Sequence, residues 1–328
     1  MYLDAMKKIA LLTSGGDAPG MNAAIRSIVK TCLHHKIIPF GINDGYQGMI
    51  DGRGRELKYK DVDNIIQLGG TILGSARSLL FHQTEGRRKA IKFLEEMDVN
   101  GLIVIGGDGT FTGAGILSEE MNIPVIGIPG TIDNDIFGTD FTIGFDTALN
   151  TVIDAVDKIR DTASSHHRVF FIEVMGRDAG FIALHSAIAG GAESVLIPEE
   201  KTDLNKLAHT IRNSYKGRRS TIILVAEGDD EGHALDILGK VKPLLPEYDL
   251  RHSVLGHIQR GGSPSVQDRI LATRLGNYAV ELLREGKTGL MVGVKGAELV
   301  SCPMIDAIKE HAKPNLSYLE LIDVLRTK

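Results

Sequence analysis

The sequence predicts an α/β protein of two lobes, each a mainly parallel sheet flanked by helices. Three observations lead to this fold class. A chain of 328 residues is long enough for roughly two domains. Short apolar runs alternate with helical patterns, as they do in parallel sheets. The opening pattern of strand, glycine-rich turn and helix is repeated from residue 169, which indicates a second lobe that starts near residue 145.

Composition and charge exclude several classes of protein. The chain is 43% hydrophobic and 24% charged, with a net charge of -5, so no basic excess predicts binding to nucleic acid or to an anionic membrane. Its two cysteines are too few for a disulfide framework and fit a reducing compartment. No targeting segment or apolar run of about 18 residues is present, so we expect a cytoplasmic protein.

The first lobe opens with a strand, a glycine-rich turn and a helix. Residues 13–22 follow the first apolar run, and Ala23 to Leu33 then show helical spacing. Glycines let backbone N–H groups approach an anion, and a helix N-terminus adds partial positive charge, so this turn predicts a phosphate site. The alternative is a tight turn that only joins strand to helix. The predicted strands of this lobe are residues 9–12, 37–42, 102–105 and 125–128.

Two further loops of the first lobe have polar or glycine-rich sequences. Residues 44–48 are expected to form a turn, and 69–77 a glycine-rich loop that ends in Arg77. The guanidinium of Arg77 carries a fork of donors that can reach a phosphate. A lone arginine is more often a solvated surface residue, and that interpretation stays open from the sequence.

Two acidic loops follow the third and fourth predicted strands. In residues 106–110, Asp108 offers oxygens to magnesium and Thr110 can donate to a phosphate. Residues 129–135 place Thr131, two carboxylates and Asn134 together, which is enough to hold a magnesium ion and accept a proton. The alternative is a hydrophilic turn in which an aspartate caps the next helix. Because ligands bind beyond the C-terminal ends of parallel strands, both loops are expected to converge in one cleft.

The second lobe repeats the alternation of strands and helices. A helix is expected over 147–160, a polar connector over 161–168 and a glycine turn over 175–180. The predicted strands of this lobe are residues 169–174, 195–198, 222–225 and 254–258. A helix over 270–284 and a strand over 291–294 complete the pattern along the chain.

Arginines near these turns point to phosphoryl transfer. That reaction needs positive charge on phosphates, a metal between them and a group that orients or deprotonates the acceptor. A lysine P-loop is excluded because Glu281 stands where its leading glycine must be. A dinucleotide fingerprint fails at Thr112, so a dehydrogenase is a poor alternative. The arginines beside glycine turns or strand ends are Arg77, Arg168, Arg177, Arg251 and Arg260.

Five stretches together resemble the bacterial ATP-dependent 6-phosphofructokinases. They are TSGGDAPGMN (13–22), GGDGT (106–110), PGTIDND (129–135), MGR (175–177) and GHIQRGG (256–262). The resemblance implies transfer of the γ-phosphoryl group of ATP to the 1-hydroxyl of fructose 6-phosphate, with Mg2+, as the committed step of glycolysis. It also implies a homotetramer with the active site in the cleft between discontinuous lobes. The ATP lobe would be 1–144 and 259–309, and the sugar-phosphate lobe 145–258 and 310–328.

The resemblance also implies a role for each site residue. Asp133 matches the general base, Thr131 lies beside the transferred group, and Arg177 stabilises charge near the phosphates. Asp108 and Asp135 match the magnesium-linked acids. The nucleotide contacts are Gly16, Tyr46, Arg77, Asp108, Gly109 and Thr110. The sugar-phosphate contacts are Thr131, Asp133, Asp135, Arg168, Met175, Gly176, Arg177, Glu227, Arg251, His257 and Arg260, of which Arg168 and Arg251 come from a neighbouring subunit.

Two glycines favour ATP over pyrophosphate as donor. Pyrophosphate users of the family carry Asp at the position of Gly109 and Lys at that of Gly130, and an acid at 109 would crowd and repel the α-phosphate. A pyrophosphate-dependent phosphofructokinase and a non-catalytic regulatory nucleotide-binding subunit are the alternatives.

The resemblance further implies an effector site for ADP or phosphoenolpyruvate. Its residues would be Arg26, Lys30, Arg160, Gly191, Glu193, Lys216 and Arg218. Lys30 stands where an arginine is common, which loses the bidentate fork, and Tyr59 replaces another usual arginine between Lys58 and Lys60. We therefore expect an altered or weak allosteric response.

Overall fold

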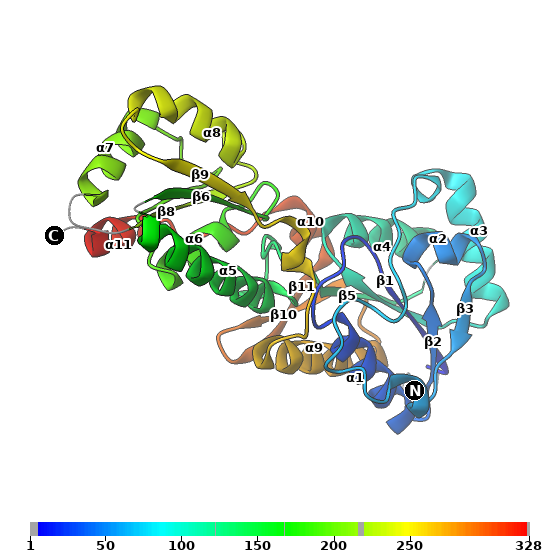
Figure 1. Ribbon diagram of the computed structural model, residues 1–328. Coiled ribbons are helices and arrows are strands. Elements are labelled where there is room, and N and C mark those ends of the chain that lie inside the picture. Colours follow the sequence, from blue (N-terminus) through cyan, green and yellow to red (C-terminus); the bar gives the residue numbers. More distant parts are fainter. Residues whose placement is uncertain (1–5, 122, 167, 216–219, 327–328) are drawn as a thin grey trace. The chain divides into compact units, whose positions relative to one another are not determined.

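The chain folds into two compact units. The computed structural model describes residues 6–121, 123–166, 168–215 and 220–326. The larger unit comprises Met1–Ile132, Ile136–Thr147 and Arg260–Ala312, and the smaller comprises Asp133–Asp135, Ala148–Gln259 and Lys313–Lys328. Both are α/β units in which helices flank a sheet (Figure 1), which confirms the predicted fold class. Which ligand each unit binds stays a prediction.

The larger unit contains a seven-stranded sheet of order β11-β10-β5-β4-β1-β2-β3. The five inner strands are parallel, and the two edge strands, β11 and β3, pair antiparallel with their neighbours. The strands are β1 (Lys8–Thr13), β2 (Ile38–Ile42), β3 (Gly54–Glu56), β4 (Gly101–Gly106), β5 (Val125–Pro129), β10 (Leu290–Lys295) and β11 (Glu298–Pro303). All six residues of β4 and all five of β5 are buried, as expected for parallel strands covered on both faces.

Helices of the larger unit pack on this sheet in a shared apolar core. That core joins β4 to α4 and α10 through Val104, Phe111 and Met304. The helices are α1 (Met21–His34), α2 (Gly45–Ile50), α3 (Thr84–Glu96), α4 (Asp108–Met121), α9 (Val266–Arg284) and α10 (Met304–Lys309), with single turns η1 (Tyr59–Val62) and η2 (Leu80–His82). Helix α5 (Phe145–His166) begins in the larger unit and continues in the smaller.

The strand order creates a switch point between β1 and β4. From β1 the chain moves outward to β2 and then returns to β4 on the other side of β1. Ligands of open α/β sheets bind beyond the strand ends at such a point. The turn that starts at Ser14 and the turn at Gly107 follow these two strands, so both lie where the fold favours a ligand.

The smaller unit has a four-stranded parallel sheet of order β7-β8-β6-β9. Val169, Phe171 and Ile223 lie in its core with Leu207 of α7 and Ile237 of α8. The strands are β6 (Val169–Val174), β7 (Ser194–Leu196), β8 (Thr221–Ala226) and β9 (Leu250–Val254). The helices are α6 (Phe181–Ala189), α7 (Leu204–Tyr215), α8 (Ala234–Val241) and α11 (Ser317–Arg326), with single turns η3 (Lys242–Leu244) and η4 (Gly256–Arg260).

Three expectations about local structure were wrong. The stretch 44–48 is mostly helix α2 and not a turn. Asp44 adopts a left-handed backbone conformation (φ 54°), and the residues after it form a helix that buries Tyr46 and Met49. The connector 161–168 is mainly the end of α5, whose buried face continues to Ala163. The expected strand 254–258 lies earlier, as β9, since Gly256 (φ 54°) ends the extended backbone and η4 follows.

Asp268 of α9 caps the N-terminus of α5 from another helix. It is 1% exposed, and its carboxylate accepts hydrogen bonds from the backbone N–H groups of Gly144 and Thr147, both at 2.8 Å, and from the Thr147 hydroxyl at 2.5 Å. The first N–H groups of a helix have no acceptor within the helix, and the Asp268 carboxylate supplies one.

Asp268→Ala is expected to destabilise the fold by about 1–3 kcal/mol, because buried N–H groups lose a charged acceptor. Urea unfolding followed by circular dichroism measures the change. Asp154→Ala is the control, since Asp154 is an exposed residue of α5 that pairs with Lys158 on the same helix face, and such pairs contribute about 0.5 kcal/mol or less. Equal midpoints for both variants would show that Asp268 is not a structural cap.

Candidate active site

The turn after β1 lies against Arg260. Ser14 donates its N–H to the Ile105 carbonyl at 3.0 Å, which ties the start of the turn to β4. The Arg260 guanidinium donates to the Asp17 carbonyl at 3.3 Å. A Cβ atom on Gly16 would lie 2.5 Å from Nη1 of Arg260, so glycine leaves the space that the guanidinium occupies. Arg260 was expected in the sugar-phosphate site, and the structure places it beside the predicted nucleotide turn.

Thr13 and Asn22 hold the glycine-rich loop 69–77 in place. Thr13 donates its hydroxyl to the Gly74 carbonyl at 2.7 Å. The Asn22 amide donates to the carbonyls of Leu68 and Gly69 at 3.1 and 3.0 Å, and its oxygen accepts the Ile72 N–H at 2.8 Å. Arg77 ends this anchored loop and is exposed. Both anchors lie in the stretch 13–22, which the sequence indicated only as an anion-binding glycine turn. The anchoring roles of Thr13 and Asn22 were not predicted.

Tyr46 supports the first turn of α4. Its ring is 5% exposed and stacks on Phe81 with centroids 4.1 Å apart. Its hydroxyl donates to the Thr110 carbonyl at 2.5 Å, and burial raises the pKa of the phenol well above its usual range. Thr110 is itself buried and donates its hydroxyl to the Ser14 carbonyl at 3.2 Å. A nucleotide contact by Tyr46 stays a prediction; the structure shows a packing and positioning role.

Gly109 and Gly130 have different surroundings. A Cβ atom on Gly109 would meet nothing within 4 Å, so a side chain there would extend into open space. A Cβ atom on Gly130 would lie 2.9 Å from Ile105 Cγ2 and 3.1 Å from Met21 Cε. The Gly130 N–H also donates to the Gly106 carbonyl at 3.0 Å. A larger residue at 130 therefore requires apolar neighbours to move, whereas one at 109 does not.

The loop after β5 buries its polar residues. Thr131, Asp133 and Asp135 are 9%, 4% and 8% exposed. The Thr131 carbonyl accepts the Thr142 hydroxyl at 2.6 Å, and Asn134 takes a left-handed φ of 55°. Carboxylates are rarely buried in a solvated turn, so the alternative of a simple hydrophilic turn is disfavoured.

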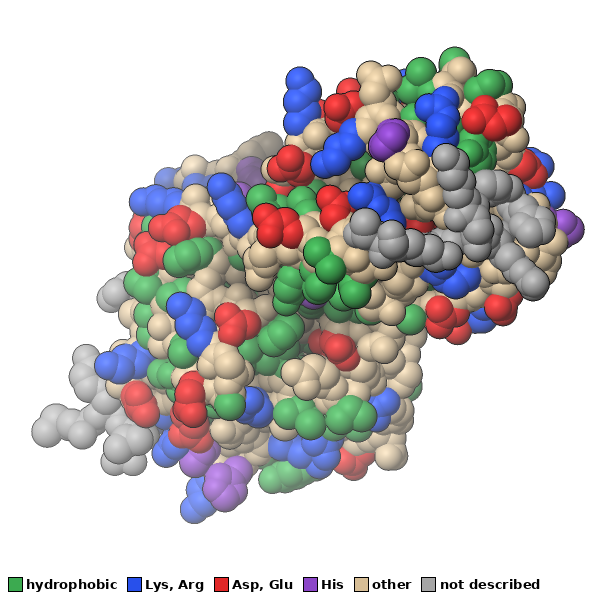
Figure 2. Space-filling model, turned by 90° about the vertical axis from the view of Figure 1, so that its left-hand side faces the viewer, with side chains coloured by type: hydrophobic (Ala, Val, Ile, Leu, Met, Phe, Trp, Pro, Cys, Tyr) green, Lys and Arg blue, Asp and Glu red, His purple; other side chains and the backbone are tan. Residues whose placement is uncertain are grey.

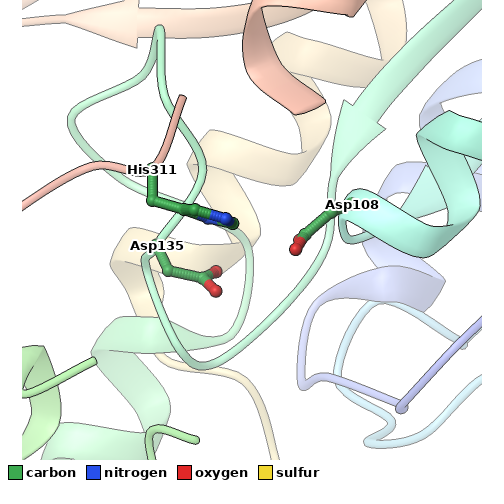
Figure 3. Close-up of side chains that lie close together, drawn as sticks. All are labelled: Asp108, Asp135 and His311. Carbon is green, nitrogen blue, oxygen red and sulfur yellow. The ribbon is translucent and has the colours of Figure 1, made fainter. Parts of the chain in front are cut away.

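Asp108, Asp135 and His311 bring their side chains together (Figure 3). One ligand atom from each lies within 4.8 Å of the others. Asp108 begins α4, and Asp135 is bonded to Ile136, whose backbone forms an isolated bridge with His311. Two carboxylates and an imidazole are a donor set that fits a divalent cation. Sequence reasoning predicted both aspartates and missed His311, which no local spacing connects to them.

Three predicted residues of the smaller unit follow β6. The Met175 N–H donates to Gln259 Oε1 at 3.2 Å, and the Arg177 N–H donates to Glu227 Oε1 at 2.8 Å. Gly176 and Arg177 take positive φ values of 142° and 55°. Glu227 directly follows β8, and the exposed His257 lies in η4 after β9. Because β8, β6 and β9 are adjacent and parallel, these residues share the C-terminal edge of the sheet.

Arg168 and Arg251 lie at the opposite edge of this sheet. Arg168 precedes β6 and Arg251 is the second residue of β9. Both pair with Asp249, Arg168 through Nε at 2.7 Å and Arg251 through Nε at 2.9 Å. The hydrogen bond from Arg168 holds the pKa of Asp249 below its usual range. A six-residue strand spans about 20 Å, so within one chain the two arginines are not brought to Met175 and His257.

The expected effector residues occur in both units. Arg160 donates to the carbonyls of Gly190 and Gly191 at 2.6 and 2.9 Å, and the buried Glu193 accepts the Ile222 N–H at 2.7 Å. Arg26 and Lys30 are one turn apart on α1 and partly buried. Lys30 Nζ lies 5.7 Å from the ring centroid of Tyr59 and 3.7 Å from Asp63. Lys216 and Arg218 lie outside the described residues.

Surface charge and helix composition add two findings. Lys and Arg side chains are interspersed with Asp and Glu on the face shown in Figure 2. Within the ranges that the structure describes, no helix combines the length and apolar character needed to cross a membrane.

Comparison with known proteins relates the whole chain to one family. The family model described as Phosphofructokinase matches residues 8–283. The chain is 51% identical over 308 residues to ATP-dependent 6-phosphofructokinase 2 of Bacteroides thetaiotaomicron, covering 94% of each chain. It is 52% identical over 321 residues to ATP-dependent 6-phosphofructokinase of Cytophaga hutchinsonii, covering 98% of each.

A solved structure shows the same fold. Phosphofructokinase from Saccharomyces cerevisiae superposes with a TM-score of 0.88 at 36% identity. The match covers 92% of this chain and 45% of the yeast chain, so this chain spans a little under half of that protein's length.

Proposed function

This chain belongs to the phosphofructokinase family, and on that premise we propose that it is an ATP-dependent 6-phosphofructokinase. It transfers the γ-phosphoryl group of MgATP to the 1-hydroxyl of fructose 6-phosphate, giving fructose 1,6-bisphosphate and ADP. The observation that carries the proposal is about half identity over nearly the full length of relatives with this name. A coupled assay with ATP, Mg2+ and fructose 6-phosphate tests it, with pyrophosphate as the alternative donor. Turnover with pyrophosphate alone would contradict it.

Asp133 is the proposed general base. Its buried carboxylate accepts the proton of the sugar hydroxyl as that oxygen attacks phosphorus in line. Arg177 stabilises the negative charge that develops on the phosphoryl oxygens, and Thr131 flanks the transferred group. Such charge stabilisation usually supplies the larger share of the rate enhancement.

Asp108 and Asp135 are the proposed holders of Mg2+. Their carboxylate oxygens suit this cation, and the proximity of the two side chains supports a shared site. When bound, Mg2+ would offset the negative charge on the phosphates of the donor. The remaining nucleotide contacts are proposed for the turns after β1 and β4 and for Arg77.

The sugar-phosphate site is proposed to need a second subunit. Met175, Gly176, Glu227, His257 and Arg260 would come from one chain. The remaining cations, Arg168 and Arg251, lie at the opposite edge of the sheet, where both pair with Asp249, so they would serve the site of a neighbouring copy. A site shared by two chains requires at least a dimer, and the family resemblance extends this proposal to a homotetramer. Sedimentation equilibrium measures the oligomeric state directly.

Gly109→Asp is expected to raise the KM for ATP at least about tenfold, because a carboxylate near the α-phosphate adds repulsion between like charges. The position is open and its φ is not positive, so the fold should tolerate the side chain and the effect should fall on the ligand. Gly115→Asp is the matched control, since Gly115 is on the same helix and is equally open. An unchanged KM in Gly109→Asp would contradict the proposed donor position.

The effector site is proposed to respond weakly. Lys30 lacks the fork of arginine and lies against Tyr59 and Asp63, so it holds a phosphate less firmly. At subsaturating fructose 6-phosphate, ADP or phosphoenolpyruvate should change the rate by less than about fivefold, the low end of allosteric coupling. Lys30→Arg should enlarge the response, whereas Lys92→Arg on the exposed face of α3 should not. If ADP and phosphoenolpyruvate changed the rate of neither wild type nor Lys30→Arg, the proposed effector site would be contradicted.

A further inference from the structure

His311 lies at the cation site that the two aspartates form. Its ring points toward the carboxylates of Asp108 and Asp135 in Figure 3, and one ligand atom from each residue lies within 4.8 Å of the others. The roles expected for the active-site residues did not include His311.

Two features of the fold hold His311 in this position. The Ile136–His311 bridge fixes its backbone beside the residue that follows Asp135. Helix α10, which ends two residues before His311, packs through Met304 and Ala307 into the same core as Phe111 of α4, the helix that Asp108 begins. His311 is therefore positioned by its backbone bridge and by the helix that precedes it, although its side chain is exposed.

The geometry is close to that of a coordination sphere. Ligands on opposite sides of an octahedral ion with bonds of about 2.1 Å lie about 4.2 Å apart, and adjacent ligands lie closer. An ion equidistant from three atoms that lie 4.8 Å apart is about 2.8 Å from each. Bonds of about 2.1 Å therefore require each group to approach the ion by up to about 0.7 Å.

An imidazole changes which ions such a site accepts. Mg2+ takes oxygen ligands and water and gains little from a nitrogen donor. Transition-metal ions bind imidazole well, with affinity rising from Mn2+ through Co2+ toward Cu2+. We propose that His311 is a third protein ligand of this site, so that the site binds Co2+ and related transition-metal ions as well as the Mg2+ of the proposed kinase reaction.

The inference rests on the proposed function only for the presence of a cation site, and its test does not depend on turnover. Purified wild-type protein is titrated with Co2+ alone. Binding is followed by visible absorption, and histidine coordination by the strongly shifted, exchangeable ring N–H resonance of a Co2+-bound imidazole. We expect this resonance in wild type and its loss in both His311→Gln and Asp108→Asn.

The variants also separate nitrogen ligation from general damage to the site. His311→Gln keeps a polar side chain but offers no ring nitrogen, so Co2+ affinity should fall about tenfold or more. His34→Gln, at the exposed end of α1, should leave the Co2+ affinity unchanged.

Three results would overturn the inference: no Co2+ binding to wild type, no histidine resonance, or equal Co2+ affinity in wild type and His311→Gln. The proposed function fails separately. A wild-type protein that shows the His311-dependent resonance but does not phosphorylate fructose 6-phosphate would retain the cation site and lose the kinase assignment.

Discussion

Asp133→Asn is expected to lower kcat about 10²–10⁴-fold while the dissociation constant for fructose 6-phosphate stays within a few-fold of wild type. Asparagine has the same shape as aspartate but cannot accept the proton of the attacking hydroxyl. The substitution is nearly isosteric at a position that is 4% exposed, so packing of the loop after β5 should be retained. The loss should therefore appear in the chemical step and not in binding.

The two quantities are measured separately. The coupled assay at saturating ATP gives kcat, and equilibrium dialysis with labelled fructose 6-phosphate gives the dissociation constant. Asp154→Asn, an exposed carboxylate of α5, controls for the general effect of removing an acid. A near-normal kcat in Asp133→Asn would exclude Asp133 as the base, and an equal loss of sugar binding would show a positioning role instead.

Local patterns were sufficient to predict most of the buried parallel strands, but not the edge strands β3 and β11 or the position of β9. Apolar runs such as 102–105 and 125–128 became β4 and β5, because strands covered on both faces need no polar alternation. The glycine turns that follow these strands predicted the position of Asp108 and Asp133. In a parallel sheet the turns that follow the strands all lie at the same edge, so both residues were expected beyond the C-terminal ends of the strands.

Features that depend on contacts distant in sequence could not be predicted. His311 reaches the two aspartates only because its backbone pairs with Ile136 and α10 packs beside α4, and neither relation leaves a local signal. The sharing of Asp249 by Arg168 and Arg251 likewise depends on the pairing of β6 with β9. Polar residues 161–166 suggested a connector, yet α5 continues to His166 with Ala163 buried in its last turns.

Mixing two inactive variants is expected to restore activity if Arg168 serves a neighbouring subunit. Arg168→Ala should weaken fructose 6-phosphate binding by about a hundredfold, because the phosphate loses charge-assisted hydrogen bonds. In a 1:1 mixture with Asp133→Asn, a site with an intact Asp133 occurs with a probability of about one half. An intact Arg168 from the facing copy is equally frequent, so about a quarter of the sites should be wild type.

The experiment needs dissociation and reassembly of the mixed subunits, followed by the coupled assay at low fructose 6-phosphate. Asp133→Asn mixed with Arg177→Ala is the matched control. Arg177 follows β6 at the same sheet edge as Met175 and Glu227, so we expect Arg177 and Asp133 to serve the same site from the same chain. Every site in this mixture then carries one of the two substitutions, and no wild-type site can form. Recovery in the first mixture and none in the second would establish that Arg168 crosses between subunits. If neither mixture recovered activity, Arg168 would act within its own chain. Its position at the opposite edge of the β6 sheet from Met175 would then need a different explanation.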